Sequence, residues 1–302
     1  VTIYILIPLL IIPQLILSGV VVKFDKLNPV IGNTATVPFV GDIMASRWAF
    51  EAGMVTQFKD NRYEQEFYYL DKVMADADYK KIYYIPELET KLQFCLNNLN
   101  TQDNELKRKL INDLDLLRNE IRREAELVDR DHYKWIDNIA VNRFDSTTYS
   151  EAIGFLGNIR RLYINRYTKA DGDKEQKISL MTDTPEKEKS YAALRDGYRN
   201  EAIADFVKNL TETHRIIEKD GKLIQKIFPI YKDPDPDHFI DFDAQFYMPK
   251  KHFLNRNIDT LFFNMGVIWS MSFVLMLTLY FDLLRRVIDG IGNLSNPLNR
   301  RM

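Results

Sequence analysis

The sequence predicts an all-α membrane protein: two transmembrane helices, a re-entrant helical hairpin and a large extracytoplasmic helical bundle. Two uncharged runs, residues 1–22 and 260–281, predict the transmembrane helices. A bilayer core of about 30 Å needs roughly 20 apolar helical residues, and each run supplies them. Nearly all charged residues lie between these runs, where apolar residues recur at helical spacing. The mean hydropathy of −0.29 therefore averages segments of opposite character.

We divide the chain where its composition changes. The expected parts are a transmembrane helix over 1–22, a re-entrant or interfacial helical hairpin over 23–62, an extracytoplasmic helical domain over 63–257, a transmembrane helix over 258–284 and a cytoplasmic tail over 285–302. Basic pairs at residues 285–286 and 300–301 place the tail in the cytoplasm by the positive-inside rule. Because the chain begins inside an apolar run without a signal cleavage site, we expect a fragment of a longer protein.

The segment "VGDIMASRWAFEAGMVTQF", residues 40–58, is apolar but contains Asp42, Arg47 and Glu51. Arg47 and Glu51 are four residues apart, so they can pair on one helix face. A helix with such charges is tolerated at membrane depth only when it packs against protein that satisfies its polar groups. The alternative is an amphipathic helix lying flat in the interface.

The spacing of apolar residues in the polar region between the two uncharged runs predicts a series of amphipathic helices. The clearest spans residues 101–128, starts with Thr101 or Asp103 as a cap, and carries leucine and isoleucine on one face. That face comprises Leu106, Leu110, Leu114, Leu117, Ile121, Ala125 and Val128. We expect Leu110, Leu114, Leu117 and Ile121 to be buried against a partner helix, with Leu156, Ile159 and Tyr163 as the expected partners. The charged run "KADGDKEQK" around Gly172 is expected to end the partner helix. Asp220-Gly221 predicts a turn, followed by extended chain that returns to the membrane.

The chain lacks the motifs of common catalytic and nucleotide sites. It contains no G-x-x-x-x-G-K-[ST] phosphate loop and no G-x-S-x-G elbow, and its four histidines have no metal-ligand spacing. Four aspartates fall at calcium-loop positions: Asp233, Asp235, Asp237 and Asp241. However, His238 and Ala244 stand where that loop needs glycine and glutamate, which favours a rigid acidic loop. We therefore expect no catalytic, cofactor-binding or metal-binding residue in this chain.

The charge balance argues against a nucleic-acid-binding protein, and the cysteine content excludes an intrachain disulfide. Lysine and arginine number 41 against 43 acidic residues, so the net charge of −2 argues against a general nucleic-acid surface. Cys95 is the only cysteine, so no intrachain disulfide can form.

The order of features resembles the C-terminal part of the permease of ABC exporters of the G type, the white and pleiotropic-drug-resistance group. The matching residues are Ser18-Gly19 after an apolar run, "SRWAFEA" at 46–52 with Gln57-Phe58, and the apolar run that ends in "DLLRR". The resemblance covers residues 1–62 and 258–290. The roughly 190-residue helical insertion between them departs from the short external loop of eukaryotic members, and is expected of a bacterial variant.

The resemblance implies the fifth and sixth spans of an ATP-driven exporter, with a re-entrant hairpin between them. It implies cavity-lining residues Ile11, Ile12 and Leu15, and an apolar plug at Val20 and Val21. ATP and magnesium would bind a nucleotide-binding domain that this chain lacks, and two half-transporters would form a homodimer or heterodimer. The implied location is the inner membrane, multi-pass, with the helical domain in the periplasm.

A second interpretation is a membrane-anchored extracytoplasmic helical interaction or scaffold protein, whose apolar helices only tether it. The gene upstream of Val1 distinguishes the two. A phosphate loop and signature motif there support the exporter, whereas a start codon near Val1 supports the anchor.

Overall fold

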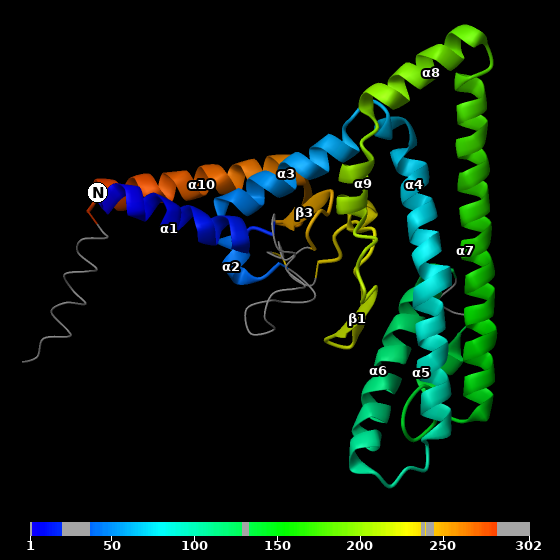
Figure 1. The fold of residues 1–302 in the computed structure, drawn as a ribbon. Helices are drawn as coiled ribbons and strands as arrows, with labels where there is room; N and C mark the ends of the chain where they lie inside the picture. Colours follow the sequence, from blue (N-terminus) through cyan, green and yellow to red (C-terminus); the bar gives the residue numbers. More distant parts are fainter. Residues whose placement is uncertain (1, 20–36, 129–132, 237–238, 240–244, 283–302) are drawn as a thin grey trace, which may run out of the picture.

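The computed structural model describes residues 2–19, 37–128, 133–236, 239 and 245–282 (Figure 1). The chain forms two arms that meet at an angle. The apolar arm contains α1 (Thr2–Leu17), α2 (Phe39–Asp42), α3 (Ala45–Lys59) and α10 (Thr260–Tyr280). The helical arm contains α4 (Glu64–Tyr79), α5 (Ile85–Asn97), α6 (Asn104–Glu126) and α7 (Ser146–Met181).

Shorter elements complete the fold. They are the π-helix η2 (Lys80–Tyr84), the 3₁₀ helices η4 (Lys134–Asn138) and η5 (Pro229–Tyr231), the helices α8 (Pro185–Tyr198) and α9 (Glu201–Lys208), and the strands β1 (Ile216–Lys219), β2 (Lys222–Gln225), β3 (Lys250–Phe253) and β4 (Arg256–Asp259). η2 joins α4 to α5 without a break in direction, while α8 crosses from the end of α7 back toward α9 (Figure 1).

Local sequence sets the helix starts. The Asp103 side chain accepts a hydrogen bond from the Glu105 backbone N–H at the start of α6, which satisfies one of the free donors of the first turn. Thr184 caps α8 in the same way, and a proline stands in the first turns of α5 and α8. These caps follow from the sequence, and Asp103 rather than Thr101 occupies the cap position of α6.

The predicted core of the helical arm is confirmed. Leu110, Leu114, Leu117 and Ile121 of α6 are almost completely buried, in one cluster with Leu156, Ile159 and Tyr163 of α7. The two ends of the predicted face differ, because Leu106 is only partly buried and Val128 is exposed. α5 contacts both α6 and α7 and contributes Leu88 and Leu92 to the same core. The spacing of three and four residues therefore placed these side chains on the correct face.

The predicted break at Gly172 is wrong, because α7 continues through it as one helix of 36 residues. A helical glycine costs only about 1 kcal/mol relative to alanine, which packing readily offsets. The charges that suggested a solvated loop instead pair with α4: Lys174 with Asp71 at 2.5 Å and Lys177 with Glu66 at 2.7 Å.

The all-α prediction is also wrong, because the chain contains two small antiparallel hairpins. β1 pairs with β2 around Asp220 and Gly221, whose φ angles of 52° and 69° fit a tight hairpin turn. The Asp-Gly signal predicted this turn. β3 pairs with β4 around Leu254 and Asn255, also at positive φ, and this second hairpin leads directly into α10. No glycine marks the second turn, so this hairpin has no Asp-Gly signal of the kind that marks the first.

The prediction of two transmembrane helices is corrected to one candidate in the described residues. Only α10 is long and apolar enough to cross a membrane, and 11% of its most apolar stretch is buried, unlike a core helix. α1 has 16 residues and is followed by Ser18 and Gly19, whose φ of 77° departs from helical geometry. Its length of about 24 Å falls short of a bilayer core of about 30 Å.

Replacing Leu117 by alanine tests the core of the helical arm. The side chain is 0% exposed, so Leu117→Ala should lower the free energy of unfolding by about 2–5 kcal/mol. Denaturant unfolding of the full chain in detergent measures this. Leu180→Ala on α7 is the matched control, because Leu180 is 61% exposed and should change stability by less than about 0.5 kcal/mol. Equal effects of the two changes would contradict the assigned core.

Candidate functional site

α3 packs lengthwise against α10, and the two helices run in opposite directions. Lys59, at the end of α3, pairs with Asp259, which caps the start of α10. Farther along, the Asn264 side-chain amide donates to the Trp48 carbonyl at 3.0 Å. Ala45, the first residue of α3, lines the same groove as Met271 in the middle of α10. The order of these contacts fixes the antiparallel register.

α1 lies beside the same pair of helices. The Ser46 hydroxyl donates to the Gln14 carbonyl at 3.2 Å, and α1 contacts α3. Figure 1 shows α1, α3 and α10 side by side in the apolar arm.

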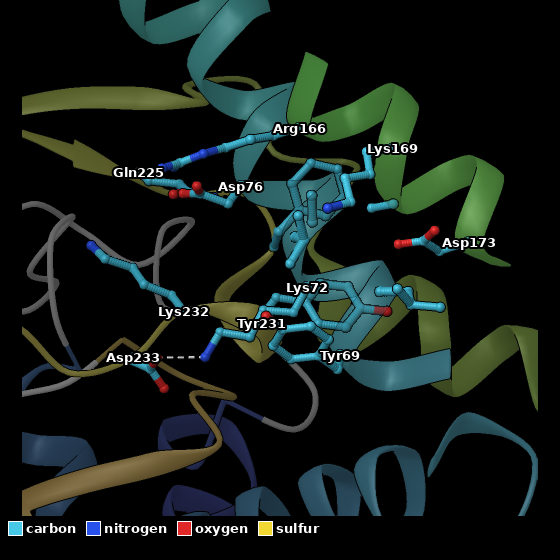
Figure 2. Close-up of a pocket in the computed structure, with 15 residues that line it drawn as sticks. Tyr69, Lys72, Asp76, Arg166, Lys169, Asp173, Gln225, Tyr231, Lys232 and Asp233 are labelled. Atoms are coloured by element: carbon cyan, nitrogen blue, oxygen red, sulfur yellow. Dashed lines mark hydrogen bonds and ion pairs between the residues drawn. The ribbon is translucent and has the colours of Figure 1, made fainter. Parts of the chain in front are cut away.

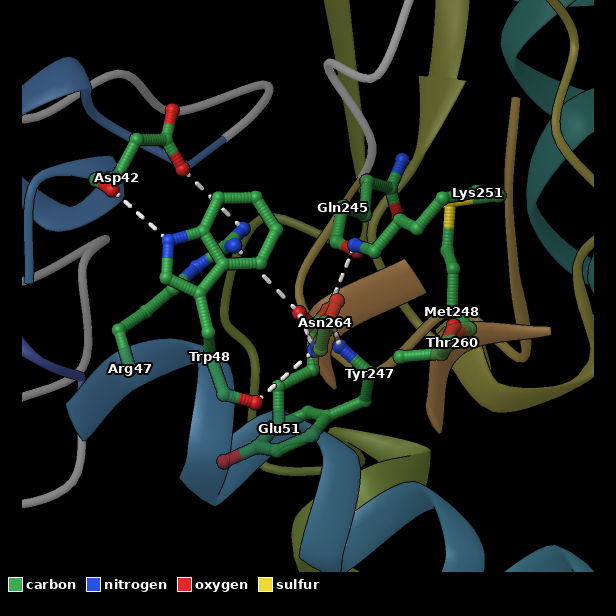
Figure 3. A network of polar contacts seen from close by, with 10 residues as sticks. All are labelled: Asp42, Arg47, Trp48, Glu51, Gln245, Tyr247, Met248, Lys251, Thr260 and Asn264. Carbon is green, nitrogen blue, oxygen red and sulfur yellow. Dashed lines mark hydrogen bonds and ion pairs between the residues drawn. The ribbon is translucent and has the colours of Figure 1, made fainter. Parts of the chain in front are cut away.

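The carboxylate of Glu51 is the centre of a buried polar network on the α10 side of α3 (Figure 3). One oxygen accepts from the Lys251 ammonium at 2.7 Å and from the Tyr247 backbone N–H at 3.2 Å. The other accepts from the Asn264 amide at 3.0 Å. Glu51 and Lys251 are both 0% exposed, so this ion pair is shielded from water by protein alone.

Arg47 extends the network toward α2. Its guanidinium lies 3.6 Å from Glu51 and 3.4 Å from Asp42, and its central carbon lies 3.8 Å from the centre of the Trp48 ring. The Trp48 indole N–H donates to the Asp42 carbonyl at 2.8 Å. The structure thus brings Arg47 and Glu51 together on one face of α3, as their spacing suggests, but the nearer cation to Glu51 is Lys251.

The network is electrically balanced. Asp42 and Glu51 carry two negative charges, and Arg47 and Lys251 carry two positive charges. Burial acts to raise the pKa of Glu51, but the charges of Lys251 and Arg47 and the hydrogen bonds from Lys251 and Asn264 outweigh it and lower that pKa. Burial lowers the pKa of Lys251, against the attraction of Glu51. Glu51 and Lys251 therefore each favour the ionised form of the other.

Backbone strain accompanies the network. Tyr247 adopts a φ of 71°, which is uncommon for a bulky side chain. In this conformation its N–H donates to Glu51. Such a conformation costs of order 1–3 kcal/mol and persists where surrounding contacts determine it.

Two members of the site were missed from the sequence. From the sequence, Lys251 looks like an interfacial anchor beside Lys250. Asn264 is a polar residue inside an uncharged, mostly apolar run. Both lie about 200 positions from Glu51, so helical spacing could not connect them. The signal available was the polar amide inside the apolar run, because such a residue needs a partner at membrane depth.

The residues implied as a translocation pathway are only partly described. Ile11, Ile12 and Leu15 lie on α1 and are 47%, 54% and 45% exposed. Val20 and Val21 lie outside the described residues.

An apolar groove of about 900 Å³ opens between α10 and residues of α1, α2 and α3. Its walls include Phe39, Ile43, Trp48, Phe263, Val267 and Met271. Phe39 is 77% exposed and Ile43 is 57% exposed, so the groove is uncovered in the isolated chain. Exposed apolar surface of this extent indicates contact with lipid or with further protein.

The described residues hold no group of three or more histidine, cysteine or acidic side chains that could bind a metal. In the candidate calcium loop, Asp233 pairs with Lys72 and Asp235 with Arg123, while Asp237 and Asp241 lie outside the description. Within the charge network the Lys251 ammonium is held as a hydrogen-bond donor to Glu51. The chemistry of the network is that of a rigid polar joint between α3, β3 and α10.

Comparisons with protein-family models, with curated proteins and with solved structures found no match to this chain.

Replacing Lys251 by methionine tests the network. Lys251→Met leaves Glu51 buried without its nearest cation, so the free energy of unfolding should fall by about 3–5 kcal/mol. The double variant Glu51→Leu/Lys251→Met removes both charges and should cost less than the sum of the two single changes. Unfolding of each variant by denaturant in detergent gives the coupling energy.

The matched control is Lys187→Met in the exposed pair with Asp183. Those side chains are 55% and 44% exposed, so their loss should cost less than about 1 kcal/mol. If the losses in unfolding free energy of the two single variants add up to the loss in the double variant, Glu51 and Lys251 do not stabilise each other.

Proposed function

We propose that this chain is the C-terminal part of the membrane-spanning permease of an ATP-driven ABC exporter of the G type. The observation that carries the proposal is the antiparallel packing of α3 on α10 around Glu51. The stretch "SRWAFEA", on which the family resemblance rests, is the part of α3 that supplies Arg47, Trp48 and Glu51 to the network. The charged side chains of a half-charged helix beside an apolar helix are thus paired with protein charges, which supports a re-entrant segment.

The register of α3 favours a re-entrant placement over a flat interfacial one. If α10 crosses the bilayer, α3 lies along it, so its start at Ala45 sits deeper than its end at Lys59. A helix lying flat in the interface would instead cross α10 at a steep angle. Its pairing of Lys59 with Asp259 and of Trp48 with Asn264 supports the lengthwise arrangement.

α3 also supports a mechanical role, because it belongs to both arms. Its first half packs on α10, and its second half contributes Val55 and Phe58 to a core with Val207, Ile230 and Tyr231. A displacement of α10 or α3 in a transport cycle would therefore be passed to the helical arm. The helical arm would act as an extracytoplasmic cap that moves with the membrane part.

The proposal includes partners and location. ATP and magnesium bind a nucleotide-binding domain encoded elsewhere in the parent protein, and two half-transporters form a homodimer or heterodimer. The uncovered groove and the exposed face of α10 are available to the rest of the permease and to lipid. The location is the inner (cytoplasmic) membrane, with the helical arm in the periplasm.

Depth measurements test the re-entrant placement. Ala45→Cys and Gln57→Cys, both exposed positions on α3, are labelled with a nitroxide in reconstituted bilayers. Since 12 residues of helix span about 18 Å, the label at 45 should lie much deeper, with higher oxygen and lower nickel-chelate accessibility. Cys95 is buried and should stay unlabelled. Equal depth at both positions would place α3 flat in the interface.

Labelling from outside tests the topology. Lys189→Cys on exposed α8 should react with an impermeant thiol reagent in intact cells whose outer membrane, if present, is permeabilised. Reaction only after the inner membrane is opened would place the helical arm in the cytoplasm and contradict the exporter topology.

The coding sequence of the parent protein tests the function itself. A phosphate loop and an ABC signature motif upstream of Val1 are expected, and the isolated chain should neither bind nor hydrolyse ATP, because it lacks the phosphate loop. An upstream region without these motifs would favour the membrane-anchored interaction protein. Specific stoichiometric ATP binding by this chain in calorimetry would contradict the assignment of ATP to a separate domain.

A further inference from the structure

A second groove, of about 740 Å³, lies in the helical arm and away from the charge network. Its walls come from α4, α7 and residues 225–233, three segments far apart in the sequence (Figure 2). The apolar part of the lining includes Leu70, Val73 and Phe228, and the aromatic rings of Tyr69 and Tyr231 stand beside it. The groove is large enough for a small organic molecule.

The groove collects positive charge. Four cations line it, Lys72, Arg166, Lys169 and Lys232, with three acids, Asp76, Asp173 and Asp233. Lys72 and Asp233 form an ion pair at 2.5 Å, which leaves three cations against two carboxylates. In Figure 2, Arg166 and Lys232 point into the side of the groove that holds Gln225, while Lys169 and Asp173 lie on the opposite side.

Within the described part of the chain, the three remaining cations form no ion pair closer than 4.0 Å, although Arg166 acts on Asp76, and Lys232 on Asp235, over a longer distance. The same helices pair their charges just beyond the groove: Lys174 of α7 meets Asp71 of α4, and Lys177 meets Glu66. The central carbon of the Arg166 guanidinium lies 5.4 Å from the centre of the Tyr163 ring. Burial raises the pKa of Asp76, and the charge of Arg166 acts to lower that pKa without forming a close ion pair. The lysines of α7 just beyond the groove thus form close ion pairs with α4, whereas the cations of α7 inside the groove do not.

We propose that this groove binds a small organic oxyanion, a phosphate ester or carboxylate with an apolar body, between Arg166 and Lys232. This site does not depend on the proposed exporter function.

The chemistry of the lining selects this class. The planar guanidinium of Arg166 matches the oxygens of a phosphate or carboxylate, and Lys232 adds a point charge. Lys232 is half-buried, and burial lowers the pKa of its ammonium, so a bound anion would restore the favourable interactions that it lost with water. The apolar and aromatic wall would cover the body of the ligand. Asp76 and Asp173 would accept from hydroxyl groups on it.

Phenyl phosphate is the probe, titrated calorimetrically into the full chain in detergent. We expect saturable binding that weakens at least about tenfold in Arg166→Gln/Lys232→Gln, because each removed group contributes a charge-assisted hydrogen bond. The control Lys189→Gln/Arg195→Gln removes the same charge from exposed α8, outside the groove, and should bind as the unmodified chain does. Circular dichroism of each variant confirms that it is folded.

Two comparison compounds test the ligand class. Inorganic phosphate should bind more weakly than phenyl phosphate, because it lacks the apolar body. Benzylamine, which has a similar ring and the opposite charge, should not compete. Absence of saturable phenyl phosphate binding, equal loss in the α8 control, or stronger binding of benzylamine would overturn the proposal.

Discussion

The burial of one carboxylate governs the arrangement of the apolar arm. Glu51 is removed from water, and an ionised carboxylate in such a position is costly unless cations and hydrogen-bond donors surround it. The donors come from three places in the chain: the ammonium of Lys251 in β3, the amide of Asn264 in α10, and the backbone of Tyr247 before β3. Satisfying that carboxylate therefore fixes how the second hairpin enters α10 and how α3 lies along it.

The same constraint explains why α3 carries both charged and large apolar side chains. Trp48, near its start, packs on α10, and Phe58, near its end, packs in a core that includes Ala75 of the helical arm. Each part of α3 therefore has the side chains that suit the element it contacts. Around it, α10 and α1 leave large apolar side chains uncovered. The four charges of the polar joint balance one another within the chain, whereas the apolar surface needs a nonaqueous neighbour.

The sequence was informative where interactions are local or periodic. The face of α6 that holds Leu114 and Leu117, the cap at Asp103 and the turn at Asp220 followed from short-range patterns. It misled at Gly172, where long-range ion pairs and packing outweighed a weak local preference, and at the β3–β4 hairpin, where no glycine marks the turn. For the candidate site, the spacing of Arg47 and Glu51 was visible, but the pairing with Lys251 depends on a tertiary contact that no local pattern encodes.

The length of α7 has a consequence for any motion at the junction of the arms. An unbroken helix of 36 residues is about 54 Å long, and it runs beside α4 as a stiff rod. A pivot of about 5° near α3 would carry the distant tip of that rod through about 5 Å, by the geometry of a lever of this length. Sub-ångström adjustments around Glu51 would thus become displacements as large as a side chain at the tip, far from the apolar arm.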